Sequence, residues 1–204
     1  MISYSALQSR GATKGAARRA SILAEARTIL LSRGYAHLSL RDIAKMLGVS
    51  VGNLQYYFPA KDDLVEAVIQ QEVDDDLDVL GDVEWKPSDR RTHIRKAVGK
   101  LMERLTGDAG RLYATAAYLA LHDARYRRLQ AAIYAQGLPY VEGIIARIAP
   151  FSPPRRRAQQ ARIVIAMFDG AVFQIQAQRD SLSKRDIRRF VNELSDAVDK
   201  LVDA

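Results

Sequence analysis

A short polar segment between two apolar anchors holds the residue types best suited to chemistry. Leu54 and Phe58 stand four residues apart, the spacing of anchors on the inner face of a short helix. Such a helix turns small or polar residues outward, namely Gly52, Asn53, Gln55 and Tyr56. Glutamine can pair bidentately with adenine, asparagine can donate to a base or a phosphate, and the hydroxyls of Tyr56 and Tyr57 can reach phosphate. Glycine lets the backbone approach base edges, so the segment is suited to a nucleic-acid groove.

The elements that must position this helix form a helix-turn-helix over about residues 40–58. Apolar residues at helical spacing predict a helix before the turn, and Gly48 interrupts it. Ser39 can cap that first helix, and Asp42 can reach back from its third position. Ser50 can cap the second helix, and Pro59 ends it. The second helix of such a unit can lie in the major groove while the first braces against the backbone.

Charge is distributed unevenly along the 204 residues. The first 61 residues hold nine Lys or Arg against two acids, which accounts for the whole net charge of +7. Such asymmetry indicates a polyanionic partner, although a solvated basic tail is the alternative reading. Residues 1–15 are expected to form a flexible basic arm.

The rest of the chain predicts an all-α fold of about nine helices. Glycine and proline are sparse, and no long segment alternates apolar with polar residues. Gly34 should end the first helix, Ser183 and Asp186 should form a capping box, and Pro139 should kink or restart a helix. Besides the helix-turn-helix, helices are expected near residues 16–33, 61–80, 88–105, 111–121, 124–148 and 154–178, and from 183 onward. We expect a DNA-binding domain at 1–60 and a helical regulatory and dimerisation domain at 61–204.

The stretch from Ser39 to Lys61 resembles the N-terminal domain of the tetracycline-repressor (TetR) family, and close similarity covers about Arg18 to Val68. The resemblance implies that Arg41 contacts phosphate or guanine. It implies base-facing roles for Val51, Gly52 and Gln55. It implies backbone-contacting roles for Ser39, Ser50, Asn53, Tyr56, Tyr57 and Lys61. Gln55 stands where the family most often has Tyr, Tyr57 where it often has His, and Val51 where many members have a polar or basic residue. An apolar Val51 suits a thymine methyl group.

The resemblance also implies a ligand-binding domain that dimerises through its last two helices. The residues support a dimer independently, since apolar residues form a seam along the ninth helix: Ile187, Phe190, Val191, Leu194, Val198 and Leu201. The eighth helix has two apolar faces, one with Ile163, Met167 and Gly170 and another with Val164, Phe168, Ala171 and Ile175. A helix apolar on both sides needs two partners, and Gly170 with Ala166 would permit close approach. The alternative is an internal core helix.

A ligand pocket is expected among aromatic or amphipathic residues of the regulatory domain: Trp85, Tyr113, Tyr118, His122, Tyr126, Tyr134 and Phe168. Aromatic residues at helical spacing can equally be plain core. An acidic cluster lacks the spacing and glycine of a calcium loop and is read as a solvated helix end; it comprises Glu72, Asp74, Asp75, Asp76 and Asp78.

Residue inventory argues against several other classes of protein. The chain has no cysteine and three scattered histidines, so neither a metal site, a cofactor nor catalysis is expected. No apolar run is long enough for a signal or a membrane span, which predicts a protein of the cytoplasm. The leading hypothesis is a homodimeric repressor released from a near-palindromic DNA operator by a small-molecule inducer. The alternatives are an activator or ligand-independent regulator, and an enzyme with a helical DNA-binding head.

Overall fold

The computed structural model describes residues 4–203, with side chains from residue 14 onward. The described residues form nine α-helices and two short 3-10 helices without a strand, which confirms the all-α prediction. The chain divides into two compact units, Met1–Gln71 and Glu72–Ala204. This boundary lies eleven residues beyond the expected one, because the first half of α4 (Lys61–Gly81) belongs to the first unit, where Leu64, Val65 and Val68 are buried.

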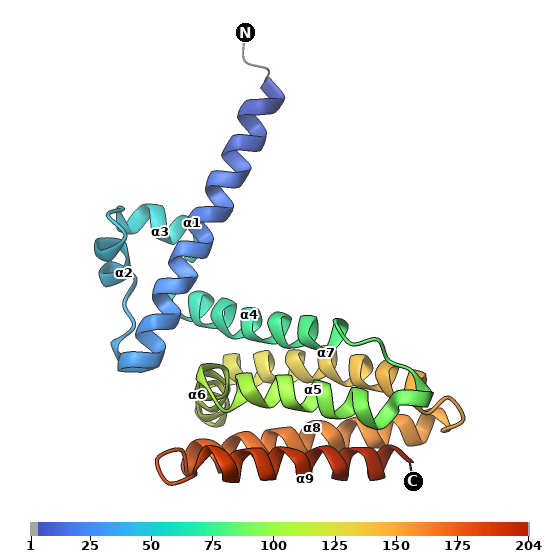
Figure 1. Ribbon diagram of the computed structural model, residues 1–204. Coiled ribbons are helices and arrows are strands. Elements are labelled where there is room, and N and C mark those ends of the chain that lie inside the picture. The colour runs from blue at the N-terminus through green and yellow to red at the C-terminus, as the bar shows by residue number, and fades with distance from the viewer. Residues whose placement is uncertain (1–3, 204) are drawn as a thin grey trace. The chain divides into compact units, whose positions relative to one another are not determined.

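The first unit contains α1 (Tyr4–Arg33), η1 (Tyr35–His37), α2 (Leu40–Met46) and α3 (Val51–Tyr57), followed by the start of α4 (Figure 1). Two positive-φ glycines shape it: Gly34 (φ 81°) ends α1, and Gly48 (φ 64°) makes the turn after α2. The structure differs from the expected flexible arm at 1–15, since α1 is already helical from Tyr4. Ala, Leu, Gln, Arg and Lys favour helix in that stretch. Residues 1–3 of the arm lie outside the described residues.

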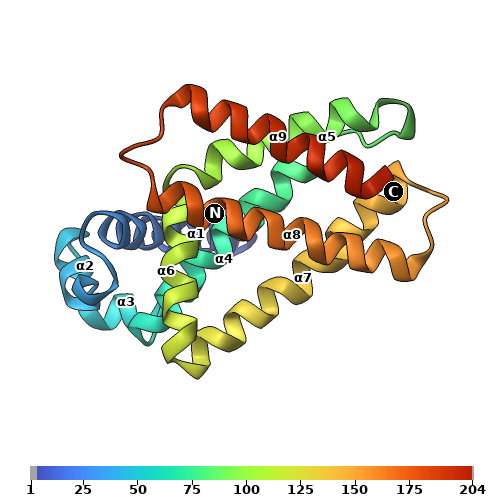
Figure 2. The same cartoon turned by 90° about the horizontal axis from the view of Figure 1, so that it is seen from below.

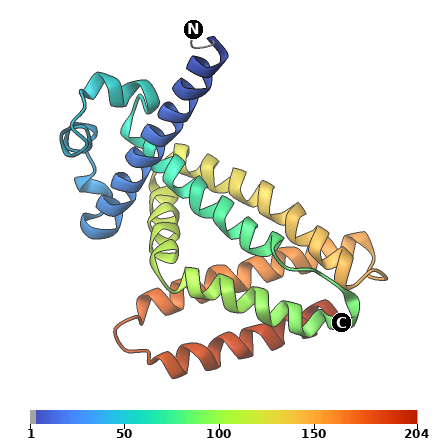
Figure 3. The same cartoon turned by 45° about the horizontal axis from the view of Figure 1, so that its top comes forward.

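The second unit consists of the rest of α4, η2 (Pro87–Asp89) and α5 (Arg90–Leu105), then α6 (Asp108–His122), α7 (Ala124–Ile148), α8 (Pro154–Ala177) and α9 (Lys184–Asp203). α9 packs along α5 and beside α8, whereas α7 packs against α6 and α8 (Figure 2). The turn between α8 and α9 brings the two helices side by side (Figure 3). Apolar side chains of α5, α7, α8 and α9 fill the core of this unit.

Of the two capping boxes expected from the sequence, one forms and the other does not, and Pro139 does not restart a helix. The capping box before α9 forms, since Ser183 N donates to Asp186 Oδ2 at 3.2 Å and Asp186 N donates to Ser183 Oγ at 3.2 Å. The capping box before α2 does not form, because the Ser39 side chain makes no capping bond. Pro139 does not restart a helix; it lies inside α7, which runs unbroken from Ala124 to Ile148.

The apolar seam of α9 requires a correction. Leu194 is 7% exposed and Val198 is 6% exposed within the single chain, because both join the core of the second unit. These two residues are therefore covered by their own subunit and offer little surface to a partner. Ile187, Phe190, Val191 and Leu201 keep partial exposure.

Candidate nucleic-acid interface and internal cavity

Local hydrogen bonds and two apolar anchors fix α3. Ser50 caps the helix as expected, accepting a bond from Asn53 N at 3.1 Å. Gly48 N donates to Lys45 O at 3.2 Å, and Val49 N reaches back to Ala44 O at 2.9 Å, which closes the turn after α2. Leu54 and Phe58 are buried, as the spacing predicts. The side of α3 opposite these anchors is thereby held outward.

That outward side carries the polar residues expected to contact DNA. Gly52, Asn53 and Gln55 are exposed, and Tyr56 is 83% exposed with its ring edge-on to Tyr57 at 5.3 Å between centroids. A Cβ added to Gly52 would meet nothing within 4 Å, so the fold itself does not require glycine there. Its small size matters only to whatever approaches this face from outside the unit.

The remaining DNA-contact candidates flank α3. Arg41 and Ser50 are exposed, whereas Ser39, Val51 and Tyr57 are half-buried. These positions lie on α2, on α3 and at their N-caps, so one rigid helix-turn-helix carries them all.

Lys61, at the first turn of α4, has a defined local environment. Its ammonium lies 3.9 Å from the centroid of the Tyr35 ring, and Tyr35 donates a hydrogen bond to Asp62 Oδ1 at 2.7 Å. Burial lowers the pKa of Lys61, and the neighbouring Asp62 charge partly opposes this. Asp63 Oδ2 accepts the Ala60 N–H at 2.7 Å. Because two carboxylates already stand at this helix start, a phosphate there would rely on the Lys61 ammonium more than on the helix dipole.

Two contacts in the first unit could not be predicted from the sequence pattern. The guanidinium of Arg19 lies 5.2 Å from the centroid of the Phe58 ring, and Tyr35 supports Lys61. Both join residues far apart in the sequence, so periodicity could not reveal them.

The second unit contains a cavity of about 250 Å³. Four of the seven expected pocket residues line it: Trp85, Tyr113, Tyr134 and Phe168. The other three do not. Tyr118 and His122 are exposed and pack edge-on against each other, and Tyr126 is fully buried away from the cavity. Trp85 is held in place by a bond from its Nε1 to Leu80 O at 3.0 Å.

Two carboxylates that the sequence did not single out for the pocket also line the cavity. Asp76 accepts bonds from Arg104 Nε at 2.6 Å and Tyr113 Oη at 2.7 Å. Burial raises the pKa of Asp76, and these two bonds oppose that rise. Burial and the adjacent Asp76 raise the pKa of Tyr113, so its hydroxyl stays protonated and donates.

The other cavity carboxylate is Asp169, on α8. It accepts a bond from Tyr134 Oη at 2.8 Å, and burial raises its pKa. A signal for it existed in the sequence, because Asp169 is a lone acid within an otherwise apolar stretch of α8.

The reading of residues 72–78 as a solvated helix end is wrong for two of its members. Glu72 is buried, with a side chain only 5% exposed, and its carboxylate pairs with Arg104 at 3.1 Å. Asp76 pairs with the same guanidinium. A positive charge from α5 compensates them, which a reading of α4 alone could not foresee.

Comparison with known proteins identifies the family of the helix-turn-helix region. Residues 22–68 match the family model described as bacterial regulatory proteins, tetR family. Residues 22–68 therefore form a domain of the TetR family type. No curated protein sequence matches the chain significantly.

Solved structures extend the TetR likeness to the fold of most of the chain. Salmonella enterica GusR matches with a TM-score of 0.71 at 18% identity, over 91% of this chain and 95% of that one. A TetR regulator from Haloarcula marismortui matches at 0.70 and 20%, over 89% and 98%. A putative transcriptional regulator from Saccharomonospora viridis, solved in complex with choline, matches at 0.64 and 17%, over 92% and 96%. At these identities the likeness establishes the shared fold, that of TetR-type transcriptional regulators.

In this TetR-type fold, α8 presents an apolar stripe away from its own core. Its buried face holds Val164, Ala171 and Ile175, as expected for one of its two apolar faces. On the opposite face Ile163 is 47% exposed and Phe173 is 50% exposed. Exposed small residues complete the stripe at heptad-like spacing: Ala166, Gly170 and Ala177. Met167 is half-buried beside it. Sequence reasoning missed Phe173, although it extends the same stripe.

Two further properties concern the described residues as a whole. They contain no group of three or more His, Asp or Glu side chains placed to hold a metal ion. Within the same part of the chain, every helix is too short or too polar to cross a bilayer.

Proposed function

We propose that this TetR-family regulator is a homodimeric repressor whose α3 reads a near-palindromic operator, and which a small molecule releases by binding the cavity of the second unit. The exposed polar face of α3 is the observation that carries the proposal. Leu54 and Phe58 anchor the helix, so Gly52, Asn53 and Gln55 face outward with no role in the core. A mostly apolar cavity in a separate unit supports the proposed binding of an effector.

The proposed contacts divide into two kinds. Val51, Gly52 and Gln55 would meet base edges, with Gln55 pairing with adenine through its amide. Six other residues would contact phosphates and so fix the register on the DNA: Ser39, Ser50, Asn53, Tyr56, Tyr57 and Lys61. Arg41 would contact either phosphate or guanine.

We place the dimer contact chiefly on the exposed stripe of α8. Large apolar side chains that remain half exposed, such as Ile163 and Phe173, are costly in water and suit a partner surface. Ala166 and Gly170 between them would let two copies of α8 approach closely. A two-fold axis through such an isologous contact gives the operator its symmetry, with half-sites about 34–36 Å or a multiple of that apart.

Operator selection with purified protein tests the DNA half. Wild-type protein should enrich a near-palindromic sequence from a random duplex library. Gln55→Ala should relax base choice at one position in each half-site, a loss of roughly 1–3 kcal/mol in discrimination. The matched control, Gln136→Ala, changes an exposed glutamine of α7 and should return the wild-type operator. Identical operators from wild type and Gln55→Ala would remove Gln55 from the readers.

Sedimentation equilibrium tests the dimer half. Wild-type protein at micromolar concentration should have twice the mass of one chain. Ile163→Glu puts a charge into the exposed stripe without touching the core and should give folded monomers with weak operator binding. Ala135→Glu introduces the same group on the exposed surface of α7 and should stay dimeric. A monomeric wild type would refute this part of the proposal.

Transcription in vitro separates a repressor from an activator. With the selected operator placed across a promoter, the protein should lower transcript yield, and an effector should restore it. A rise in transcript on adding the protein would make it an activator instead.

A further inference from the structure

The charge lining the cavity of the second unit is one-sided. Within the described residues, its walls hold two carboxylates, Asp76 and Asp169, and no Lys, Arg or His. Most of the remaining lining is aliphatic, with a few aromatic rings and the amide of Gln130. An anionic ligand would find no positive group here, and a cationic ligand would find two acids.

The two carboxylates are not equivalent. Asp76 already has a full counter-charge, since the Arg104 guanidinium lies 2.6 Å from its Oδ1. Asp169 has only the neutral hydroxyl of Tyr134, 2.8 Å from its Oδ2, and no basic side chain in the described part of the chain forms an ion pair with it. A partly buried carboxylate without a counter-charge is costly, and a bound cation would remove that cost.

Aromatic rings surround the same space. Trp85, Tyr113, Tyr134 and Phe168 all contribute to the cavity wall. Aromatic faces attract organic cations through their quadrupole, and the attraction grows when water is excluded. Asp169 and the rings therefore favour the same chemical class.

We propose that the cavity binds an organic cation with an apolar body, whose single amine or ammonium group pairs with Asp169. The proposal rests on the effector role proposed above and names the chemistry of that effector. Size limits it further. An apolar cavity of about 150 Å³ holds benzene, so about 250 Å³ admits a molecule of about ten non-hydrogen atoms.

Three probes of one skeleton and different charge test this proposal on the full-length protein: 2-phenylethylamine, 2-phenylethanol and phenylacetate. Binding is followed at pH 7 by calorimetry and by fluorescence of Trp85, the single tryptophan, which lines the cavity. The amine should bind about tenfold or more tightly than the alcohol, and phenylacetate should bind weakest. Asp169→Asn keeps an acceptor for Tyr134 but removes the charge, so it should lower amine affinity about tenfold and leave alcohol affinity unchanged.

Two control variants isolate the charge at this position. Asp180→Asn removes the same charge from a fully exposed side chain just after α8 (100% exposed) and should leave all three affinities unchanged. Asp169→Glu keeps the charge and should retain preference for the amine. Equal affinities of wild type for amine and alcohol, amine binding that ignores Asp169→Asn, or no amine binding at millimolar concentration would each overturn the proposal. Should Asp169→Asn fail to fold, the probe ranking on wild type decides alone.

Failure of this inference can be told apart from failure of the proposed function. The binding measurements use no DNA, so they test the cation site alone. If the protein prefers the amine but the amine has no effect on operator binding in a separate DNA-binding assay, the cation site is supported and release by an inducer is refuted. If a neutral or anionic compound binds the cavity and releases the operator, release by an inducer is supported and the preference for a cation is refuted.

Discussion

Replacing Arg104 with methionine should destabilise the second unit strongly. Its guanidinium bonds Asp76 Oδ1 at 2.6 Å and Glu72 Oε2 at 3.1 Å, and lies 3.5 Å from Asp75. The first two carboxylates are largely buried, with side chains 16% and 5% exposed. Methionine keeps the apolar stem of the arginine and removes only the charge and its donors.

The magnitude follows from the burial of these partners. Removing one member of a buried ion pair costs about 3–5 kcal/mol, because a charge is left uncompensated. Arg104 is itself 27% exposed, so water compensates part of the loss. The pair with Asp75 adds little, since that carboxylate is about half exposed. We expect the free energy of unfolding at pH 7 to fall by about 2–4 kcal/mol.

The loss should depend on pH with a definite sign. Burial already raises the pKa of Asp76, and removing Arg104 should raise it further. A carboxyl whose folded-state pKa is raised stabilises the fold below its ordinary range and loses that contribution as pH rises through the folded pKa. The variant should therefore recover part of its stability between pH 7 and pH 5, as Asp76 takes up a proton.

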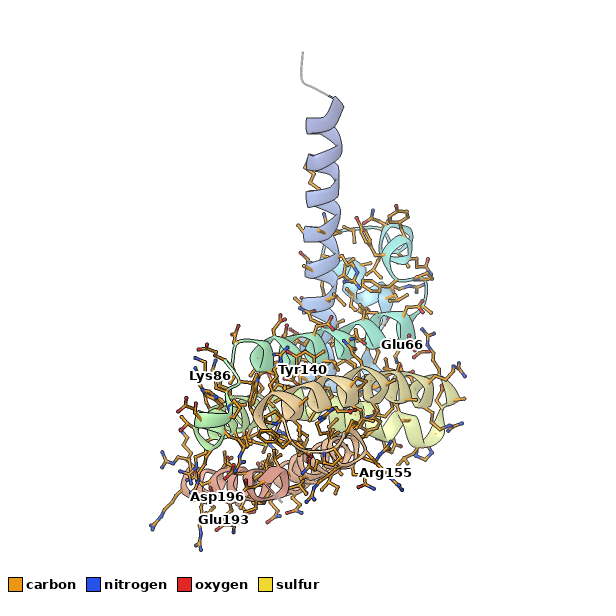
Figure 4. All side chains as sticks on the ribbon, turned by 90° about the vertical axis from the view of Figure 1, so that its right-hand side faces the viewer. Glu66, Lys86, Tyr140, Arg155, Glu193 and Asp196 are labelled. Atoms are coloured by element: carbon orange, nitrogen blue, oxygen red, sulfur yellow. The ribbon has the colours of Figure 1, made fainter. Side chains whose placement is uncertain are left out.

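Urea denaturation followed by Trp85 fluorescence measures this in the second unit. The protein concentration is held fixed, because the proposed dimer would couple association to stability. Lys86→Met is the control. Lys86, which is labelled in Figure 4, pairs at 2.7 Å with the exposed Glu84, so its replacement should leave stability unchanged. A loss in Arg104→Met no larger than in the control, or a loss that is the same at both pH values, would refute the reasoning.

Three other perturbations have defined outcomes. Gly110→Ala should destabilise the second unit by about 1–3 kcal/mol in urea denaturation, because the added Cβ collides with Leu105 O. In the control, Gly99→Ala, the added Cβ meets nothing within 4 Å, so the free energy of unfolding should rise by up to about 1 kcal/mol. A rise in stability in both variants would exclude the collision. Lys61→Ala should reduce the slope of log K against log salt by about 0.9 per subunit for every duplex tested, and an unchanged slope would show that Lys61 neutralises no phosphate. Asp169→Asn should raise stability at pH 7, since burial raises the pKa of that carboxyl, and the gain should fade as pH falls toward the ordinary range of aspartate; a gain that is constant with pH would contradict it.

The fold of the first unit could be predicted from the sequence because the residues that determine it are close together along the chain. The helix-turn-helix expected at 40–58 appears as α2 and α3, and the anchors Leu54 and Phe58 are both buried. Gly34 and Gly48 take the positive φ that ends one helix and turns after another. Each of these features depends on residues within about one turn of each other, which is the range over which helical periodicity and capping act.

The cavity could be predicted only in part because its polar groups depend on distant partners. The acidic residues of α4 were predicted to form a solvated helix end. In the fold, the guanidinium of Arg104 on α5 forms ion pairs with Asp76 and Glu72, which are largely buried. Aromatic residues named from helical spacing were divided by the fold: Trp85 and Tyr134 line the cavity, whereas Tyr118 is exposed. Spacing identifies which residues share a helix face but does not say what that face meets.

The last two helices illustrate this limit most sharply. An apolar stripe on an amphipathic helix has the same period whether its partner is in the same chain or in another copy. The partner therefore has to come from the fold: Leu194 on α9 is already covered within its own chain, while Ile163 on α8 remains half exposed. The same helix carries Phe168 and Asp169 on the cavity wall and Gly170 on the exposed stripe. Because a rigid helix moves as one body, a shift imposed from the cavity side would reach the stripe without any change of local structure.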